Sequence, residues 1–382
     1  MQFRILVACA VCTAALSSNA RGQDIARQDP LPDVLTQDQW QRVDEGTSRG
    51  LAWLASQQRS DGSFPSFRTG QPAVTSLAVM AFLSCGHFPG EGPYGEALDR
   101  AVDFVLAQQQ SEGLLYGGPT AMPVTQWNQG AHTANYNHAI SGLMLGEVYG
   151  MTDQSRAEKI RPALEKAIEF ARRMQLRPTP HRQDYYGWRY YRHQSLPQKG
   201  EADLSVTGWF IMFYRSARNA GFDIPEQYVD EAVKFVRNCY VEGEGGFVYG
   251  PYLKDRHISR GTTGAGLLCL TITNNYDDRI PHSAGQWMLA HPFTQYNGFE
   301  TARDRYHYGA YYASQAMFML GGEHWRQFYP PLAETLLANQ SIQGSWQPES
   351  AENDALFGNC YTTSLAILAL TPPYQLLPIY QR

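Results

Sequence analysis

The side chains best able to do chemistry recur at one position of several otherwise apolar segments. Aligned on their apolar pattern, six segments give a column that reads Thr75, His138, Thr207, Thr263, Tyr312 and Thr363. Threonine hydroxyls can hydrogen-bond back to their own helix, which gives the four threonines a structural explanation. His138 and Tyr312 break the column with larger polar groups, and the register predicts that both project toward a central cavity.

Asp203 lies one turn earlier, toward the mouth of that cavity, and is the candidate catalytic acid. Glu201 stands beside it, and His138 from the preceding segment is expected to hydrogen-bond to it. A carboxylic acid donates its proton readily when hydrogen bonds or charges stabilise the carboxylate that remains. The alternative is that Asp203 only caps the N-terminus of its helix, as aspartates commonly do.

Aromatic side chains are abundant, with 23 Tyr, 17 Phe and 8 Trp. One aromatic run lies along an apolar segment that is expected to be an inner helix, so Tyr308, Tyr311 and Tyr312 are expected to line the cavity. Trp209 is a further candidate for binding a ligand. The faces of aromatic rings can stabilise cations. They also pack helix layers together, which is the alternative interpretation.

His132 and Arg260 lie near the starts of two of these segments. Positive helix ends assist anion binding, so both residues are candidates for binding an anionic head group. The alternative is that they belong to solvated polar loops, because no metal-ligand spacing connects the histidines.

A repeated unit positions these residues. The segment RGLAWLASQQRSDGSF, residues 49–64, returns as LAETLLANQSIQGSW, residues 332–346. Both contain a Gln, then a Gly four residues later, then an aromatic residue after one more: Gln58, Gly62 and Phe64, and again Gln340, Gly344 and Trp346. Each unit has an amphipathic helix, this turn and a more apolar helix. Six such units predict an all-α (α/α)6 toroid built from six helical hairpins, with the apolar helices inside.

The first unit resembles the QW motif of the terpenoid cyclase and protein prenyltransferase superfamily. It matches at Arg49, Gly50, Trp53, Leu54, Gln58 and Gly62, with Phe64 where Trp is usual. The resemblance covers roughly residues 45–375. It implies the toroid fold and, for function, the binding and possible processing of an isoprenoid or other apolar molecule in the central cavity.

The resemblance also implies a role for Asp203. Squalene and class II diterpene cyclases carry Asp-x-Asp-Asp-Thr, whose middle Asp protonates an alkene. Here Glu201-Ala202-Asp203-Leu204-Ser205 occupies that place. The middle acid is kept, but Leu204 replaces the last one and cannot polarise it, so the acid motif is degenerate.

Protein prenyltransferases bind catalytic zinc through an Asp, a Cys and a His. The matching positions here are Tyr308, Ala310 and Gly358, so the sequence predicts no metal and no other cofactor. His307 and Cys360 lie nearby, but not at the matching positions.

The charge composition of the chain excludes one class of partner. The chain of 382 residues has a formal net charge of -5, which leaves no basic surface for nucleic acid. Arg4, the apolar run 5–16 and Ser18-Asn19-Ala20 resemble a secretory signal. We therefore expect a signal peptide over 1–20, a flexible lead-in over 21–44 and one toroid over 45–382. The mature protein is expected in the periplasm or outside the cell, without a transmembrane segment.

The sequence leaves several alternatives open. Cys85, Cys239, Cys269 and Cys360 remain after the signal and are expected as buried free thiols, with one disulfide as the alternative. The second functional hypothesis is a non-enzymatic scaffold for a protein or cell-envelope partner. The third is a glycan-active enzyme, for which Asp203 and Glu147 are the inner-helix carboxylates.

Overall fold

The computed structural model describes residues 33–118, 129–176, 186–191, 202–252, 256–274, 279–298, 304–350 and 352–380. Within these ranges the chain forms twelve α-helices: α1 (Gln37–Gln57), α2 (Ala73–Leu83), α3 (Gly95–Ala107), α4 (Gln129–Tyr149), α5 (Gln154–Met174), α6 (Leu204–Asn219), α7 (Glu226–Asn238), α8 (Arg260–Ile272), α9 (Arg279–Ala290), α10 (Tyr306–Leu320), α11 (Gly322–Ala338) and α12 (Glu352–Leu370).

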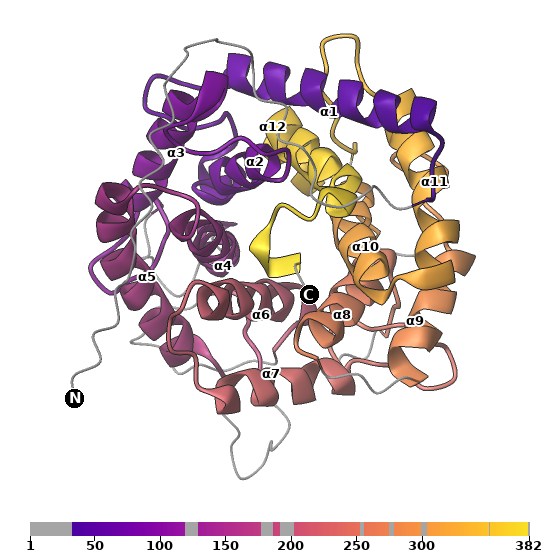
Figure 1. Ribbon diagram of the computed structural model, residues 1–382. Coiled ribbons are helices and arrows are strands. Elements are labelled where there is room, and N and C mark those ends of the chain that lie inside the picture. The colour runs from indigo at the N-terminus through magenta and orange to yellow at the C-terminus, as the bar shows by residue number, and fades with distance from the viewer. Residues whose placement is uncertain are drawn as a thin grey trace, which may run out of the picture.

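The helices form two concentric rings, which confirms the predicted α/α toroid. The even-numbered helices make the inner ring and the odd-numbered helices surround it (Figure 1). Every residue of α2 and α8 is buried, whereas α7 buries only one face. Because inner and outer helices alternate along the chain as hairpins, all inner helices run in the same direction. Their N-termini therefore meet at one face of the ring and their C-termini at the other.

In four of the six repeated units a glutamine joins neighbouring outer helices. The Gln340 side-chain amide donates to the carbonyl of Gly344 in its own turn, at 2.8 Å, and to the carbonyl of Gly46 in α1, also at 2.8 Å. These bonds connect α11 to α1 and so close the ring. The same pair of bonds recurs at three other glutamines, from Gln58 to Gly62 and Ala97, from Gln109 to Gly113 and Ala163, and from Gln175 to Tyr186 and Tyr228.

The threonine column has a different role from the one expected. The hydroxyl of Thr207 accepts the backbone N–H of Trp188, at 3.0 Å, rather than serving its own helix. Trp188 is the aromatic residue of the preceding turn, so this bond anchors an outer-layer turn to an inner helix. Three other threonines do the same, Thr75 to Phe64, Thr263 to Phe247 and Thr363 to Trp346.

The C-terminal segment folds back into the middle of the ring (Figure 1). The backbone N–H of Ile379 donates to the Glu147 carboxylate near the end of α4, and the hydroxyl of Tyr380 hydrogen-bonds to that of Tyr311 at 2.9 Å. Asn219, at the end of α6, donates to the carbonyl of Pro378. The tail therefore packs at the face where the inner helices end.

Helix α1 begins before the expected toroid boundary. It starts at Gln37, where Thr36 and Gln39 form a reciprocal capping box, and it buries Trp40 and Val43. The flexible lead-in expected over 21–44 thus overlaps the first two turns of a packed helix.

The predicted signal peptide lies outside the described residues. None of the described helices is long and apolar enough to cross a membrane. The four cysteines that follow the predicted signal are free thiols, and all but Cys85 are buried.

Candidate functional site

Asp203 is completely buried at the N-terminus of α6. Its Oδ1 accepts the backbone N–H of Val206 at 2.8 Å, which makes it the helix cap, and also accepts the hydroxyl of Ser205 at 2.7 Å. Its Oδ2 accepts from the Arg189 guanidinium at 3.0 Å. Burial raises the pKa of the carboxyl, and the charge of Arg189 is the main opposing influence. Asp203 therefore caps α6 and at the same time forms an ion pair with Arg189.

Aromatic and hydroxyl groups surround this ion pair. The Arg189 guanidinium lies over the ring of Tyr190, at 4.5 Å, and that of Tyr249, at 5.3 Å. The hydroxyls of Tyr190 and Tyr249 bond to each other, and Tyr136 bonds to Ser205. His132 stacks on Tyr190 with ring centroids 4.2 Å apart. We call Asp203, Arg189, Ser205, Tyr136, Tyr190, Tyr249 and His132 the Asp203 cluster.

His138 does not reach Asp203, contrary to the sequence-based expectation. Its Nδ1 accepts the backbone N–H of Leu115, at 3.2 Å, and its Nε2 lies 3.1 Å from the Ala167 carbonyl in α5, to which it donates. Like the threonines, it therefore anchors the preceding turn to the inner helix, and it faces the outer layer rather than the centre of the ring. Burial lowers the pKa of His138 to about 3, so the ring is neutral and both nitrogens are used.

Arg260 is not available for an anionic head group. It is 1% exposed, its Nε pairs with Asp304 at 2.8 Å, and its two terminal nitrogens donate to the carbonyls of Pro292 and Gly298. The guanidinium also lies 4.2 Å from the ring centroid of Phe293. The whole side chain thus joins the start of α8 to the segment that follows α9. Its role is structural because every nitrogen is already engaged.

The four aromatic candidates do come together, at the contact between α6 and α10. Trp209 stacks on Tyr311 at 5.4 Å and meets Tyr312 edge-on at 5.2 Å, and Tyr308 lies 4.8 Å from Tyr312. We call Trp209, Tyr308, Tyr311 and Tyr312 the central aromatic cluster. The hydroxyls of Tyr308 and Tyr312 are buried, and neither makes a hydrogen bond of normal geometry to a described residue. A buried hydroxyl without a partner costs free energy, so these two can satisfy a polar group on a bound molecule.

The sequence did not predict three residues of the Asp203 cluster: Arg189, Tyr136 and Tyr249. Arg189 follows the aromatic residue of a repeat turn, and Tyr136 precedes His138 by two positions. These positions in the sequence suggest that both residues lie near the start of an inner helix. Whether their side chains point toward Asp203 depends on how the hairpins pack in the ring. Glu201 lies outside the described residues.

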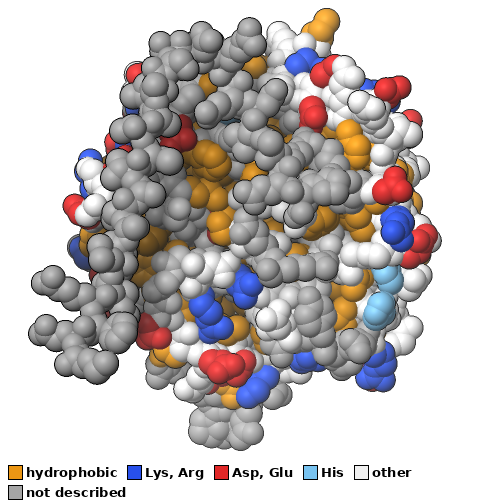
Figure 2. Space-filling view, viewed as in Figure 1, with side chains coloured by type: hydrophobic (Ala, Val, Ile, Leu, Met, Phe, Trp, Pro, Cys, Tyr) orange, Lys and Arg blue, Asp and Glu red, His pale blue; other side chains and the backbone are white. Residues whose placement is uncertain are grey.

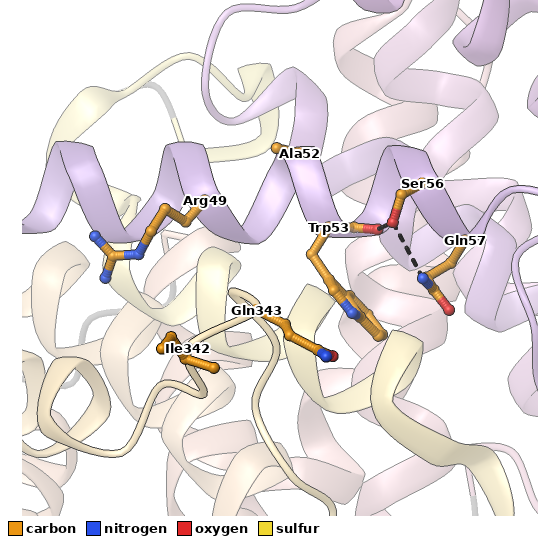
Figure 3. A pocket seen from close by; sticks show the side chains of 7 residues that line it. All are labelled: Arg49, Ala52, Trp53, Ser56, Gln57, Ile342 and Gln343. Carbon is orange, nitrogen blue, oxygen red and sulfur yellow. Dashed lines mark hydrogen bonds between the residues drawn. The ribbon is translucent and has the colours of Figure 1, made fainter.

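The outer wall carries a shallow groove where the ring closes. Arg49, Ala52, Trp53, Ser56 and Gln57 of α1 line it together with Ile342 and Gln343 of the last turn (Figure 3). The short polar bonds within it run from Ser56 to the Trp53 carbonyl and from Gln57 to Ser56. None of its lining residues is a buried titratable group, so it offers no evident catalytic chemistry.

Solved structures with this architecture include two kinds of enzyme. The type II terpene cyclase MstE from Scytonema, in complex with geranylgeranyl dihydroxybenzoate, superposes with a TM-score of 0.55 at 14% identity, over 90% of this chain and 100% of that one. A wild-type glycosidase also gives a TM-score of 0.55 at 14% identity, over the same shares. A glycosidase variant in complex with glucose gives 0.54 at 12% identity, over 90% of this chain and 100% of that one.

No protein-family model and no curated protein matches the sequence. At these identities the structural likeness establishes the fold. The chain has the α/α toroid fold that these terpene cyclase and glycosidase structures share, as its repeats predicted. The same scaffold serves glycosidases, so the chemistry has to be argued from this chain's own side chains.

Proposed function

We propose that this protein binds an isoprenoid or similarly apolar molecule inside the toroid. The observation that carries the proposal is the central aromatic cluster, whose two tyrosine hydroxyls are buried among ring faces and have no partner among the described residues other than each other. Aromatic faces provide apolar area and attract positive charge, and the hydroxyls provide directional polar contacts. Such a combination suits a hydrocarbon chain with one polar group.

The ligand would enter where the inner helices begin. At the opposite face the C-terminal tail is fixed to Glu147 and Tyr311 and buries Leu377, Ile379 and Tyr380. The Asp203 cluster lies at the entry face, and the half-buried Arg189 and His132 are its most accessible members. On the side seen in Figure 2, hydrophobic side chains gather toward the middle and charged ones toward the rim. An amphipathic ligand would therefore place its polar end near Arg189.

Turnover by alkene protonation would make Asp203 the proton donor. One carboxyl oxygen would then have to carry a proton and face the ligand, whereas both oxygens now accept hydrogen bonds and Arg189 favours the carboxylate. Arg189 would have to move away before protonation and return to stabilise the anion. We therefore propose binding as the primary function and processing as conditional on this rearrangement.

Binding is tested with geranylgeraniol and the corresponding hydrocarbon that lacks the hydroxyl. Tryptophan fluorescence reports binding, because Trp209 stacks within the cluster. Tyr312→Phe should weaken geranylgeraniol binding about 5- to 10-fold, the value of one hydrogen bond, and leave the hydrocarbon unaffected. Tyr214→Phe is the matched control, since Tyr214 is also buried with an unpartnered hydroxyl but stacks against Trp188 of the repeat turn. Absence of binding to both probes would refute the proposal.

The scaffold alternative has one supporting observation. Ile342 is 99% exposed at the edge of the outer groove, and a large apolar side chain so exposed can contact a partner protein. Native mass spectrometry of the protein from its own envelope fraction separates the two functions. A co-purifying apolar molecule lost in Tyr312→Phe supports the cavity, whereas a protein passenger lost in Ile342→Ser supports the scaffold.

The glycan-active alternative fails for the carboxylate pair on which it depended. Glu147 bonds to Ser216, which lies thirteen residues beyond Asp203 along α6. At 1.5 Å per residue the two carboxyls are about 20 Å apart, whereas glycosidases keep theirs within roughly 5–10 Å.

We also propose that the protein is exported, on the strength of the apolar run at 5–16 and the small residues at 18–20. N-terminal sequencing of the protein recovered from the cell envelope or the medium tests this. A chain that keeps Met1 and stays in the cytoplasm would contradict it.

A further inference from the structure

Three titratable side chains meet between the fifth and sixth units of the ring. His307 is the second residue of α10, Glu349 lies in the loop after Trp346, and Asp354 lies in the first turn of α12. Their potential ligand atoms all lie within 4.8 Å of one another. The side chains are 0%, 1% and 3% exposed, respectively. We call them the His307 triad; it lies outside the Asp203 cluster.

The hydrogen bonds of His307 fix which nitrogen carries the proton. The Tyr296 hydroxyl donates its only proton to the carbonyl of Gln347 at 2.9 Å, and it lies 3.2 Å from the His307 Nε2. The Nε2 must therefore be the donor, which leaves the Nδ1 with a free lone pair. Nδ1 has no hydrogen-bond partner among the described residues and lies 3.8 Å from a Glu349 oxygen, so its lone pair faces the carboxylates.

Each member of the triad contributes one unpartnered buried atom. These are Nδ1 of His307, Oε2 of Glu349 and Oδ2 of Asp354. Three electron-pair donors buried together repel one another unless a cation or a shared proton lies between them. The other Glu349 oxygen accepts the backbone N–H of His307 at 3.1 Å, which holds this carboxylate in place.

We propose that His307, Glu349 and Asp354 bind one divalent first-row transition-metal ion, with zinc as the best match. Imidazole nitrogen and carboxylate oxygen are both ligands of Zn²⁺ in proteins, and three protein ligands leave its fourth position open. The Tyr296 contact to Nε2 is the outer-shell bond that usually orients a metal-binding histidine.

The ligand atoms, which lie within 4.8 Å of one another, would have to approach by at most about 1.5 Å to reach tetrahedral spacing. Ligands of a tetrahedral zinc site lie about 3.3 Å apart, given bonds of about 2.0 Å. The 3.8 Å between Nδ1 of His307 and Oε1 of Glu349 would shorten by about half an ångström. Glu349 follows a repeat turn in a loop, and Asp354 lies in the short first part of α12, before the bend at Gly358, where φ is 78°. This ligand set differs from the prenyltransferase pattern whose absence led the sequence to predict no metal.

The competing explanation is a proton shared by the two carboxyls. Burial, with the neighbouring Glu349 charge, raises the pKa of Asp354, and Arg305 lies near enough to offset part of the negative charge. A shared proton, however, leaves the Nδ1 lone pair of His307 without a partner, whereas a metal ion satisfies all three atoms. The two explanations predict opposite responses to added zinc.

The experiment measures metal bound to the full-length mature chain. Protein freed of metal with a chelator is incubated with Zn²⁺, Mn²⁺ or Co²⁺ and desalted, and bound metal is counted by mass spectrometry. We expect one equivalent of zinc, a higher Tm, and a Co²⁺ absorption spectrum of a site with nitrogen and oxygen ligands. His307→Gln and Asp354→Asn should lose stoichiometric binding. Tyr296→Phe should weaken zinc binding roughly 10- to 100-fold, because the His307 ring loses the hydrogen bond that orients it.

Two control variants address accidental binding. His324→Gln removes a partly exposed histidine whose ring lies 5.3 Å from that of His282, a pair that could bind metal by accident. Glu147→Gln removes a buried carboxyl at the opposite face of the ring. Both should keep one equivalent. Substoichiometric metal in the wild-type chain with all three ions would overturn the proposal without depending on any variant. So would zinc that survives Asp354→Asn and is lost in His324→Gln. The metal count involves no apolar ligand, so its failure is distinguishable from failure of the proposed function.

Discussion

The buried carboxyl of Glu147 should make the stability of this protein fall as the pH rises from about 4.5 to about 7. Glu147 is 1% exposed and accepts hydrogen bonds from Ser216 and from the backbone of Ile379 in the C-terminal tail. Burial raises its pKa from 4.5 to about 7, despite those two donors.

The sign and size follow from this shift. The folded state holds the proton more tightly than the unfolded state, so the contribution is complete below pH 4.5 and is lost as the pH rises through about 7. A difference of about 2.5 pKa units corresponds to about 3 kcal/mol in the free energy of unfolding. Glu147→Gln keeps an acceptor for the Ile379 N–H and removes the ionisation. The variant should match wild type near pH 4.5 and exceed its stability by up to about 3 kcal/mol at pH 8.

Urea unfolding at several pH values between 4.5 and 8 measures the difference. Hydrogen exchange adds a local readout, because the tail amides around Ile379 should exchange faster in wild type above pH 7 and not in the variant. Glu158→Gln, at an exposed position of α5, is the matched control and should follow the wild-type pH profile. Parallel profiles for wild type and Glu147→Gln would refute the reasoning, since they would mean that the buried carboxyl does not change protonation in this range.

Three further predictions concern the ring itself, each measured as a change in the free energy of urea unfolding. Gln340→Ala removes both bonds that join α11 to α1 and should cost about 2–3 kcal/mol, whereas Gln343→Ala in the exposed groove should stay within about 0.5 kcal/mol. Gly344→Ala should cost about 2 kcal/mol or more, because φ is 102° and a Cβ would lie 2.4 Å from the Arg49 carbonyl oxygen; Gly150→Ala, with nothing within 4 Å, should not destabilise. Arg260→Lys should cost about 3 kcal/mol, since lysine cannot pair with Asp304 and reach both carbonyls at once; equal stability would mean that these bonds contribute little.

Part of the site followed from the sequence. The aromatic run on α10 indicated the central cluster, and three of its members were named from their place on an apolar helix. Asp203 was placed at a helix N-terminus, where both capping and chemistry were open, and it does cap α6. Its partner Arg189 was not foreseen, because fourteen residues separate the two and the loop between them has no periodicity to read.

His138 and the His307 triad show where pattern reasoning stops. The helical register placed His138 in a column with four threonines and Tyr312. It could not say that His138 faces the outer turns, since that depends on how the hairpin packs. His307 lies 42 and 47 residues from Glu349 and Asp354, at spacings that match no local motif. Only the packing of α10 against α12 in neighbouring hairpins brings these segments together.

The sequence by itself determined the repeating hairpin and therefore the toroid. Gln, Gly and an aromatic residue recur at fixed spacing because each makes local bonds within its own unit, such as those from Gln58 to Gly62 and from Thr75 to Phe64. Tertiary structure decided which polar side chains meet: Asp203 with Arg189, Glu147 with the C-terminal tail, and His307 with two carboxylates. The physical reason is the distance along the chain over which each kind of interaction acts. Local hydrogen bonds and helical periodicity act over a few residues and are therefore visible in sequence spacing. Contacts between distant segments depend on how the hairpins pack and on side-chain directions that no spacing encodes.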